Sequence, residues 1–192
     1  MENILYINAC CRENSRTKEL AEHLLDSLSG DIKAVDLYKE NICPIDAQLL
    51  SKRDDLLKNG MTDDKMFSLA KQFAAADTIV IAAPYWDLMF PSVLKVYLEN
   101  ITVCDVTFRY SDKGIPQSLC KAKNLYYVTT SGGYIGENNF GFDYVRTMAK
   151  GFFGIVNVRF FSAEGLDIYG ADIEKIMQKA KEDILFNIGN NS

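Results

Sequence analysis

The sequence predicts an α/β fold in which five parallel strands form one doubly wound sheet with helices on both faces. Short apolar runs of strand length alternate along the chain with stretches of helical periodicity, which is the pattern of parallel strands joined by crossover helices. The length of 192 residues and the apolar content of 48% suit one domain with a sizeable core. No internal repeat divides the chain, so residues 1–192 are expected to form a single domain.

Five apolar runs carry the strand pattern, and the clearest of them ends at Pro84. Their continuous apolar character is typical of strands that are buried on both faces. The expected strands cover residues 4–7, 32–37, 78–83, 125–130 and about 156–162.

Apolar residues at helical spacing fill the intervals between these runs. One helix is expected from Ser15 to a stop at Gly30, another has Thr62 as its N-cap with acidic residues in its first turn, and a third opens at Pro91. The other expected segments are a loop with a short helix at 38–61, a long excursion at 102–121, and helices at about 142–152 and 171–188.

This length and strand count favour the strand order 2-1-3-4-5, which is the flavodoxin-like arrangement. Ligands of such sheets bind beyond the carboxyl ends of the strands, at the switch point between the first and third strands. Three loops are therefore expected to face one site. They are residues 9–17, 84–90 and 130–138.

Composition and charge exclude several classes of protein. The chain has 26 Asp and Glu against 21 Lys and Arg, and no basic block, so binding of nucleic acid through bulk positive charge is not expected. No apolar run reaches the roughly 18 residues that span a bilayer, and a secretion signal is not expected because the first residues lack a basic segment followed by a long apolar one. The five cysteines are odd in number and lack C-x-x-C spacing, which favours a reduced, cytoplasmic protein without a structural metal site.

The chain has one histidine, His23, inside the first helical pattern. Most metal sites and most Ser-His or Cys-His catalytic groups need a well-placed imidazole. A histidine at this position is more typical of a surface or half-buried helical residue. We therefore expect a borrowed cofactor to supply the chemistry.

The first loop enters a helix amino terminus, where free N–H groups and the helix dipole favour an anion. Ser15 and Thr17 add hydroxyl donors, and Arg16 and Arg12 add positive charge. The loop contains no glycine, which argues against a dinucleotide fingerprint and against a Walker NTPase loop. The residues alone leave two interpretations open, a cradle for a terminal phosphate or simple capping of the helix.

The second and third loops also have unusual compositions. The second contains the only tryptophan, Trp86, among bulky apolar residues that could form one wall of a site for a planar ligand. Packing of these residues beneath the 102–121 excursion is the alternative. In the third loop, Gly132 and Gly133 allow close approach of a ligand to the backbone or simply form a turn.

At these residues the sequence resembles the FMN-dependent NAD(P)H:quinone oxidoreductase/azoreductase family, whose members are flavodoxin-like homodimers. The resemblance runs over nearly the whole chain and depends on the order and spacing of short segments. These segments are residues 15–17, 83–88, 94–97, 106–110, 130–133, 151–155 and 163–165.

The resemblance implies an FMN site built from all three loops. Cys10 would lie near the phosphate, and the residues that hold the phosphate would be Ser15, Arg16 and Thr17. The residues that line the isoalloxazine and ribityl chain would be Tyr85, Trp86, Asp87 and Leu88. The residues that close over the flavin edge would be Thr130, Ser131, Gly132 and Gly133. Tyr110 and Tyr134 are candidates for the substrate pocket, with packing or surface positions as the alternative.

Three positions depart from the pattern of the family. Cys10 replaces the usual serine, and Ser131 stands where some relatives have arginine. Asp87 replaces the usual asparagine, so its charge, if ionised and close to the ring, would lower the flavin potential. These differences leave the preference between NADH and NADPH open.

The implied activity is hydride transfer from NADH or NADPH to FMN, followed by transfer of two electrons to a quinone or azo compound in a ping-pong reaction. A chain that carries electrons as an FMN protein, without NAD(P)H turnover, is the first alternative. A hydrolase with Cys10 or Cys11 as nucleophile is a weaker one.

Overall fold

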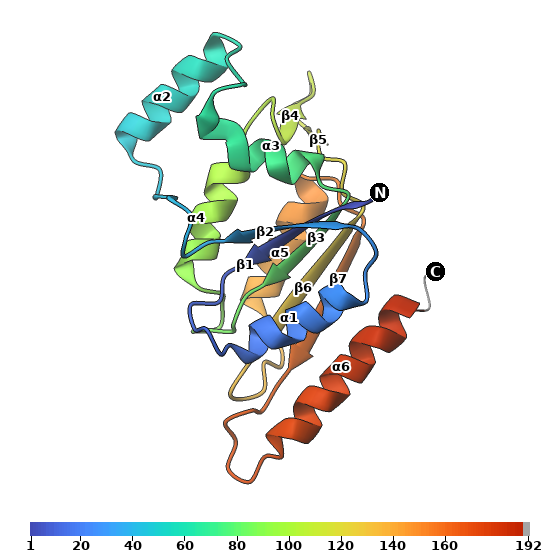
Figure 1. Ribbon diagram of the computed structural model, residues 1–192. Helices are drawn as coiled ribbons and strands as arrows, with labels where there is room; N and C mark the ends of the chain where they lie inside the picture. Colours follow the sequence, from blue (N-terminus) through green and yellow to red (C-terminus); the bar gives the residue numbers. More distant parts are fainter. Residues whose placement is uncertain (190–192) are drawn as a thin grey trace.

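The computed structural model describes residues 1–189 and contains the five-stranded parallel sheet that the sequence predicts (Figure 1). The sheet order β2-β1-β3-β6-β7 corresponds, in chain order, to the predicted 2-1-3-4-5, and every neighbouring pair is parallel. The strands are β1 (Asn3–Asn8), β2 (Asp31–Asp36), β3 (Thr78–Ala82), β6 (Asn124–Thr130) and β7 (Asn157–Ala163).

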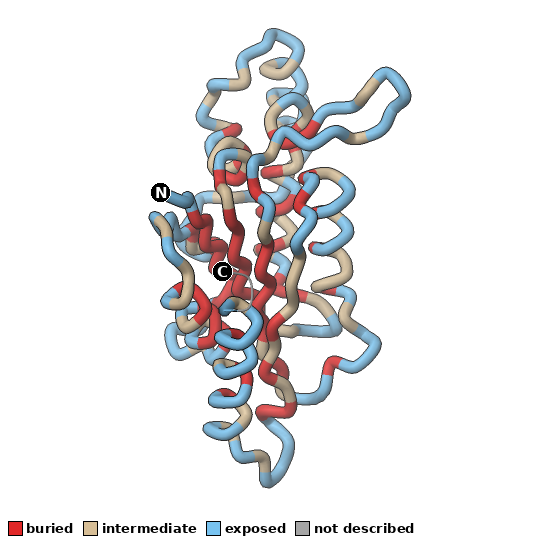
Figure 2. Tube along the Cα trace, turned by 90° about the vertical axis from the view of Figure 1, so that its right-hand side faces the viewer, coloured by how far each residue is buried: buried red, intermediate tan, exposed pale blue. Residues whose placement is uncertain are grey.

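Alternate residues of each strand face opposite helical layers, so the buried strands run between two outer shells (Figure 2). Leu5 and Ile7 belong to one core cluster, and Ile4 and Tyr6 belong to the other. The helices that cover the first cluster are α3 (Ser68–Ala75), α4 (Ser92–Ile101) and α5 (Phe140–Gly151). The helices that cover the second are α1 (Arg16–Asp26) and α6 (Ile173–Gly189).

The segment between β2 and α3 contains a helix within residues 38–61, as expected, but the start of the next helix differs from the expectation. The first of these helices, α2 (Ala47–Lys58), has 12 residues, none of which is buried, and it extends away from the sheet (Figure 1). Thr62 is not an N-cap. Instead, the Asp64 carboxylate accepts a hydrogen bond from the Met66 N–H at 2.8 Å and caps the short 3-10 helix η1 (Lys65–Phe67), after which α3 begins.

The 102–121 excursion contains an antiparallel hairpin of β4 (Phe108–Tyr110) and β5 (Pro116–Ser118). The Ser118 hydroxyl donates to the Phe153 carbonyl at 2.6 Å, and the rings of Phe108 and Phe152 lie 5.0 Å apart in an edge-to-face contact. These contacts hold the hairpin at the amino end of the sheet, opposite the carboxyl edge (Figure 1). The hairpin therefore does not cover the loops that follow the strands within its own chain, and packing of the second loop beneath it is wrong.

Within residues 1–189, no helix is both long and apolar enough to cross a membrane.

Candidate functional site

A cavity of about 430 Å³ lies at the carboxyl edge of the sheet, a size within the range of small-molecule sites. It forms at the predicted switch point, because α1 leaves β1 toward one face of the sheet while α4 leaves β3 toward the other. All three predicted loops contribute to its walls. The predicted site residues among the lining are 15–17, 85–86 and 130–132.

The amino terminus of α1 forms the polar end of this cavity. Ser15 is the N-cap, and its hydroxyl accepts from the Lys18 N–H at 3.4 Å. The N–H groups of Arg16 and Thr17 open the helix and have no acceptor within it. Together with the helix dipole and the Arg16 guanidinium, they provide a set of donors suited to an anion.

A pair of hydroxyls joins the first loop to the third. Thr17 is 1% exposed, and its Oγ1 lies 2.6 Å from Oγ1 of Thr130 at the end of β6. One hydroxyl donates to the other, so the accepting hydroxyl keeps its own hydrogen for a further acceptor. The pair thus fixes two walls of the cavity and leaves one donor for a ligand.

The second loop makes a tight turn at Trp86. The N–H of Trp86 donates to the Met89 carbonyl at 2.9 Å, and the N–H of Met89 donates back to Trp86 at 2.8 Å. Asp87 and Leu88 between them have φ values of 50° and 67°, which define a turn of type I′. Leu88 is an unusual residue for this backbone region and adds local strain.

This turn separates residues that the sequence grouped together. Trp86 lines the cavity, whereas Asp87 and Leu88 lie at the exposed tip and are outside the lining. The placement gives no support to an effect of the Asp87 charge on a flavin potential.

Main-chain hydrogen bonds join the third loop to a fourth, residues 164–170. The N–H of Leu166 donates to the Ser131 carbonyl at 3.1 Å, and the N–H of Asp167 donates to the Gly132 carbonyl at 2.9 Å. Leu166 and Asp167 line the cavity, although the sequence analysis did not name them. Their position in the sequence could have indicated this, because they follow the fifth strand and its carboxyl end lies at the same edge of the sheet as the other strands' carboxyl ends.

The Glu164 carboxylate fixes the far part of the third loop. It accepts from the N–H of Ile135 at 2.9 Å and from the Ser162 hydroxyl at 2.8 Å. The Tyr85 hydroxyl donates to the Asn138 carbonyl at 2.8 Å, which ties the second loop to the third. The loops around the cavity therefore support one another.

Four further site candidates lie outside the lining. Cys10 is buried below the cavity. Gly133 borders open space, because a β-carbon added there would meet nothing within 4 Å. Tyr134 is 78% exposed beside Gly165, and Tyr110 lies on the hairpin at the opposite end of the sheet. The roles assigned to these residues stay predictions.

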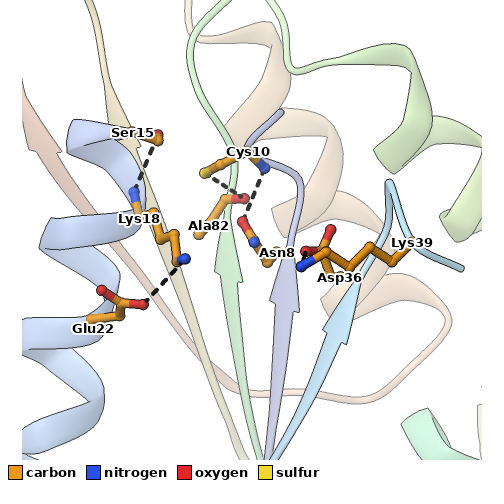
Figure 3. A network of polar contacts seen from close by, with 8 residues as sticks. All are labelled: Asn8, Cys10, Ser15, Lys18, Glu22, Asp36, Lys39 and Ala82. Carbon is orange, nitrogen blue, oxygen red and sulfur yellow. Dashed lines mark hydrogen bonds and ion pairs between the residues drawn. The ribbon is translucent and has the colours of Figure 1, made fainter. Parts of the chain in front are cut away.

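Cys10 occupies an apolar position between the ends of β1 and β3. Its sulfur points to the Ala82 carbonyl at 3.8 Å, and its N–H donates to the Asn8 side chain at 3.0 Å (Figure 3). Burial raises the pKa of the Cys10 thiol to about 11, and a hydrogen bond with Ser15 offsets this only in part. The thiol is therefore neutral near pH 7 and unsuited to act as the nucleophile of a hydrolase.

Neither of the other groups considered for hydrolysis completes a catalytic set. Cys11 is exposed and lines the cavity. His23, which is partly buried in the last turn of α1, does not line it.

Comparison with known proteins identifies the family. Residues 2–186 match the family with the flavodoxin-like fold. The chain belongs to this flavodoxin-like family. The family assignment agrees with the strand order and confirms the resemblance drawn from the sequence.

Two curated relatives of this flavodoxin-like chain share 34% identity with it over 194 residues, covering 95% of the chain and 96% of each relative. They come from Coprothermobacter proteolyticus and Lachnoclostridium phytofermentans, and both are named FMN-dependent NADH:quinone oxidoreductase. A crystal structure of azoreductase from Bacillus anthracis is similar with a TM-score of 0.85 and 24% identity, covering 99% of this chain and 100% of that one. A second, an FMN-dependent NADH-azoreductase from the same species in complex with FMN, has a TM-score of 0.83 and 24% identity, covering 99% of each chain.

Replacement of Glu164 by alanine tests the support of the third loop. Loss of a charged acceptor with two donors should lower the free energy of unfolding by about 1–3 kcal/mol, and the Ile135 amide should exchange its hydrogen roughly tenfold faster or more. Hydrogen exchange followed by mass spectrometry measures the second effect. Glu137→Ala, on the exposed part of the same loop, is the control and should leave the exchange unchanged. Equal exchange in Glu164→Ala and the native chain would contradict this role.

Alkylation of the native protein tests the environment of Cys10. With a pKa of about 11, only about one Cys10 thiol in a thousand is ionised at pH 8. Iodoacetamide should therefore modify Cys11 long before Cys10, and the Cys10 rate should rise about tenfold per pH unit up to about pH 11. Peptide mass spectrometry distinguishes the two sites, and the chain unfolded in guanidinium provides the control in which both react. Rapid modification of native Cys10 at pH 7 would show that the thiol is not shielded.

Proposed function

We propose that this protein is an FMN-dependent NADH:quinone oxidoreductase that also accepts azo compounds, and that the cavity at the carboxyl edge is its FMN site. The observation that carries the proposal is the lining of this cavity, which combines the amino terminus of α1 and Arg16 with the aromatic residues Tyr85 and Trp86. FMN has the corresponding arrangement of a phosphate and a planar ring. The names of the relatives, which include both activities, support the same assignment.

The donors at the polar end fit a single terminal phosphate. The first N–H groups of α1 and the Ser15 hydroxyl belong to one helix start that lines the cavity, and the loop lacks the glycines that a pyrophosphate cradle uses. The Thr17–Thr130 pair can supply a further hydroxyl donor. These residues would hold the phosphate and fix the position of the cofactor along the cavity.

The aromatic side chains of the lining would orient the ring. Trp86 is 41% exposed, so its side chain is available for contact with a planar ring system. The Tyr85 hydroxyl is held by the Asn138 carbonyl, which keeps this side chain in one position before a ligand arrives. Such preorganisation lowers the entropy that binding would otherwise lose.

Bound FMN would accept a hydride from NADH and return two electrons to a quinone or azo compound. The protein would contribute binding, orientation and electrostatics. Such an arrangement explains how a chain whose single histidine does not line the cavity can catalyse a redox reaction. No observation favours the alternative of an electron carrier without NADH turnover.

The proposal includes a homodimer and a cytoplasmic location. Tyr110 and Ile115 of the hairpin are 54% and 59% exposed, respectively, and large exposed apolar side chains are typical of surfaces that contact a partner. The five cysteines are free thiols, which suits a reducing compartment. Sedimentation should give twice the mass of 21.6 kDa that the chain has alone, and a single-chain mass at micromolar concentration would contradict the homodimer.

Reconstitution with FMN tests the function. The purified chain should bind one FMN, show flavin absorbance and oxidise NADH when a benzoquinone or an azo dye is supplied. In a ping-pong reaction, plots of the reciprocal rate against the reciprocal NADH concentration give parallel lines at several fixed acceptor concentrations. Parallel assays with NADPH determine which donor the protein prefers.

Two outcomes would overturn different parts of the proposal. A folded chain that binds no FMN would exclude the flavoenzyme altogether. A chain that binds FMN and accepts one electron at a time, without oxidising NADH, would instead be an electron carrier.

A further inference from the structure

An ion pair crosses the polar end of the cavity. Nη1 of Arg16 lies 3.5 Å from Oδ1 of Asp167, and both residues line the cavity. Arg16 comes from the first turn of α1, whereas Asp167 comes from the loop after β7. A carboxylate thus approaches the guanidinium that the proposed function assigns to a phosphate.

The Asp167 carboxylate is held at this position by its surroundings. The N–H of Asp167 donates to the Gly132 carbonyl at 2.9 Å, which anchors its main chain to the third loop. Its Oδ2 lies so close to Gly132 that an ideal β-carbon there would be 2.4 Å away. The absence of a side chain at position 132 therefore allows the carboxylate to lie along the cavity wall, within reach of Arg16.

The contact is weak enough to be exchanged for a stronger one. The side chains of Arg16 and Asp167 are 43% and 77% exposed, and ion pairs with this exposure contribute little to stability. A phosphate carries more charge than a carboxylate and offers more acceptors to a guanidinium. A phosphate bound through Nη1 of Arg16 would take the donor that lies beside Asp167 in the free protein.

We propose that Asp167 is an internal competitor for the FMN phosphate on Arg16, which lowers the affinity for phosphate-bearing flavin and is displaced when that flavin binds. The inference depends on the proposed function, because it takes the FMN phosphate to lie at the amino terminus of α1. Asp167 acts in two ways, by engaging Arg16 in the free protein and by repelling a second anion beside it. A flavin without a phosphate, such as riboflavin, neither needs Arg16 nor meets this repulsion.

A positioning role for Asp167 would change the FMN affinity in the opposite direction. If Asp167 served to hold Arg16 in the orientation that binds phosphate, its removal would weaken FMN binding. The direction of the change in the dissociation constant therefore separates competition from positioning.

Asp167→Asn in the flavin-free protein tests the proposal. Titration with FMN, followed by quenching of flavin fluorescence, should give a dissociation constant roughly three- to tenfold lower than that of the native chain. The dissociation constant for riboflavin, measured in the same way, should change by less than about twofold. Asparagine keeps the shape of the exposed side chain, so folding should not be affected.

Two further variants complete the design. Glu174→Gln makes the same change of net charge in an exposed residue of α6 that does not line the cavity, and it should leave the FMN affinity unchanged. In an Arg16→Gln background there is no guanidinium to compete for, so Asp167→Asn should improve FMN binding by a smaller factor than in the native background.

Several results would overturn the inference. The first is an unchanged or weaker FMN affinity in Asp167→Asn. The second is a gain in riboflavin affinity equal to the gain in FMN affinity. The third is an equal gain in FMN affinity from Asp167→Asn in the native and Arg16→Gln backgrounds. In each case FMN still binds the native chain, so the proposed function survives. A native chain that refuses FMN overturns both proposals.

Discussion

The reversal of crossover direction between β1 and β3 is the constraint on which the rest of this structure depends. The connection from β1 passes over one face of the sheet through α1, and the connection from β3 passes over the other through α4. The two loops therefore diverge at the carboxyl edge and leave a space that no side chain of the core fills. Because α1 begins at this point, the same reversal also aims a helix amino terminus at the space.

The fold could be predicted because its signals are local and strong. Each buried strand is a continuous apolar run, and the crossovers between such strands have one favoured hand. The segment 38–67 was less predictable because α2 has no buried residue and only its last turns, at Leu56 and Leu57, pack against the core. Thr62 and Asp64 are both common capping residues, and sequence alone does not show which carboxylate or hydroxyl reaches a free N–H.

The candidate site could be predicted at the level of loops but only partly at the level of side chains. Arg16 and Thr17 line the cavity because they open α1 at the carboxyl edge of the sheet, where a helix fixes their direction. The turn at Trp86 has two residues with positive φ, and a backbone of this kind cannot be read from Asp87 and Leu88, since neither is the glycine that usually signals it. Asp167 was missed because its place depends on contact between two loops that are distant in sequence.

The main-chain bonds between residues 131–133 and 165–167 also bear on how such a site evolves. The N–H groups and carbonyls that form them are present whatever side chains stand at these positions. Substitution of Ser131, Leu166 or Asp167 can alter the charge and shape of the wall without removing the bonds that hold it in place, whereas Gly132 and Gly165 are restricted by a close contact and by a positive φ, respectively. Selection can therefore adjust the affinity for a cofactor or the choice of an acceptor one residue at a time, while the frame of the cavity is inherited intact.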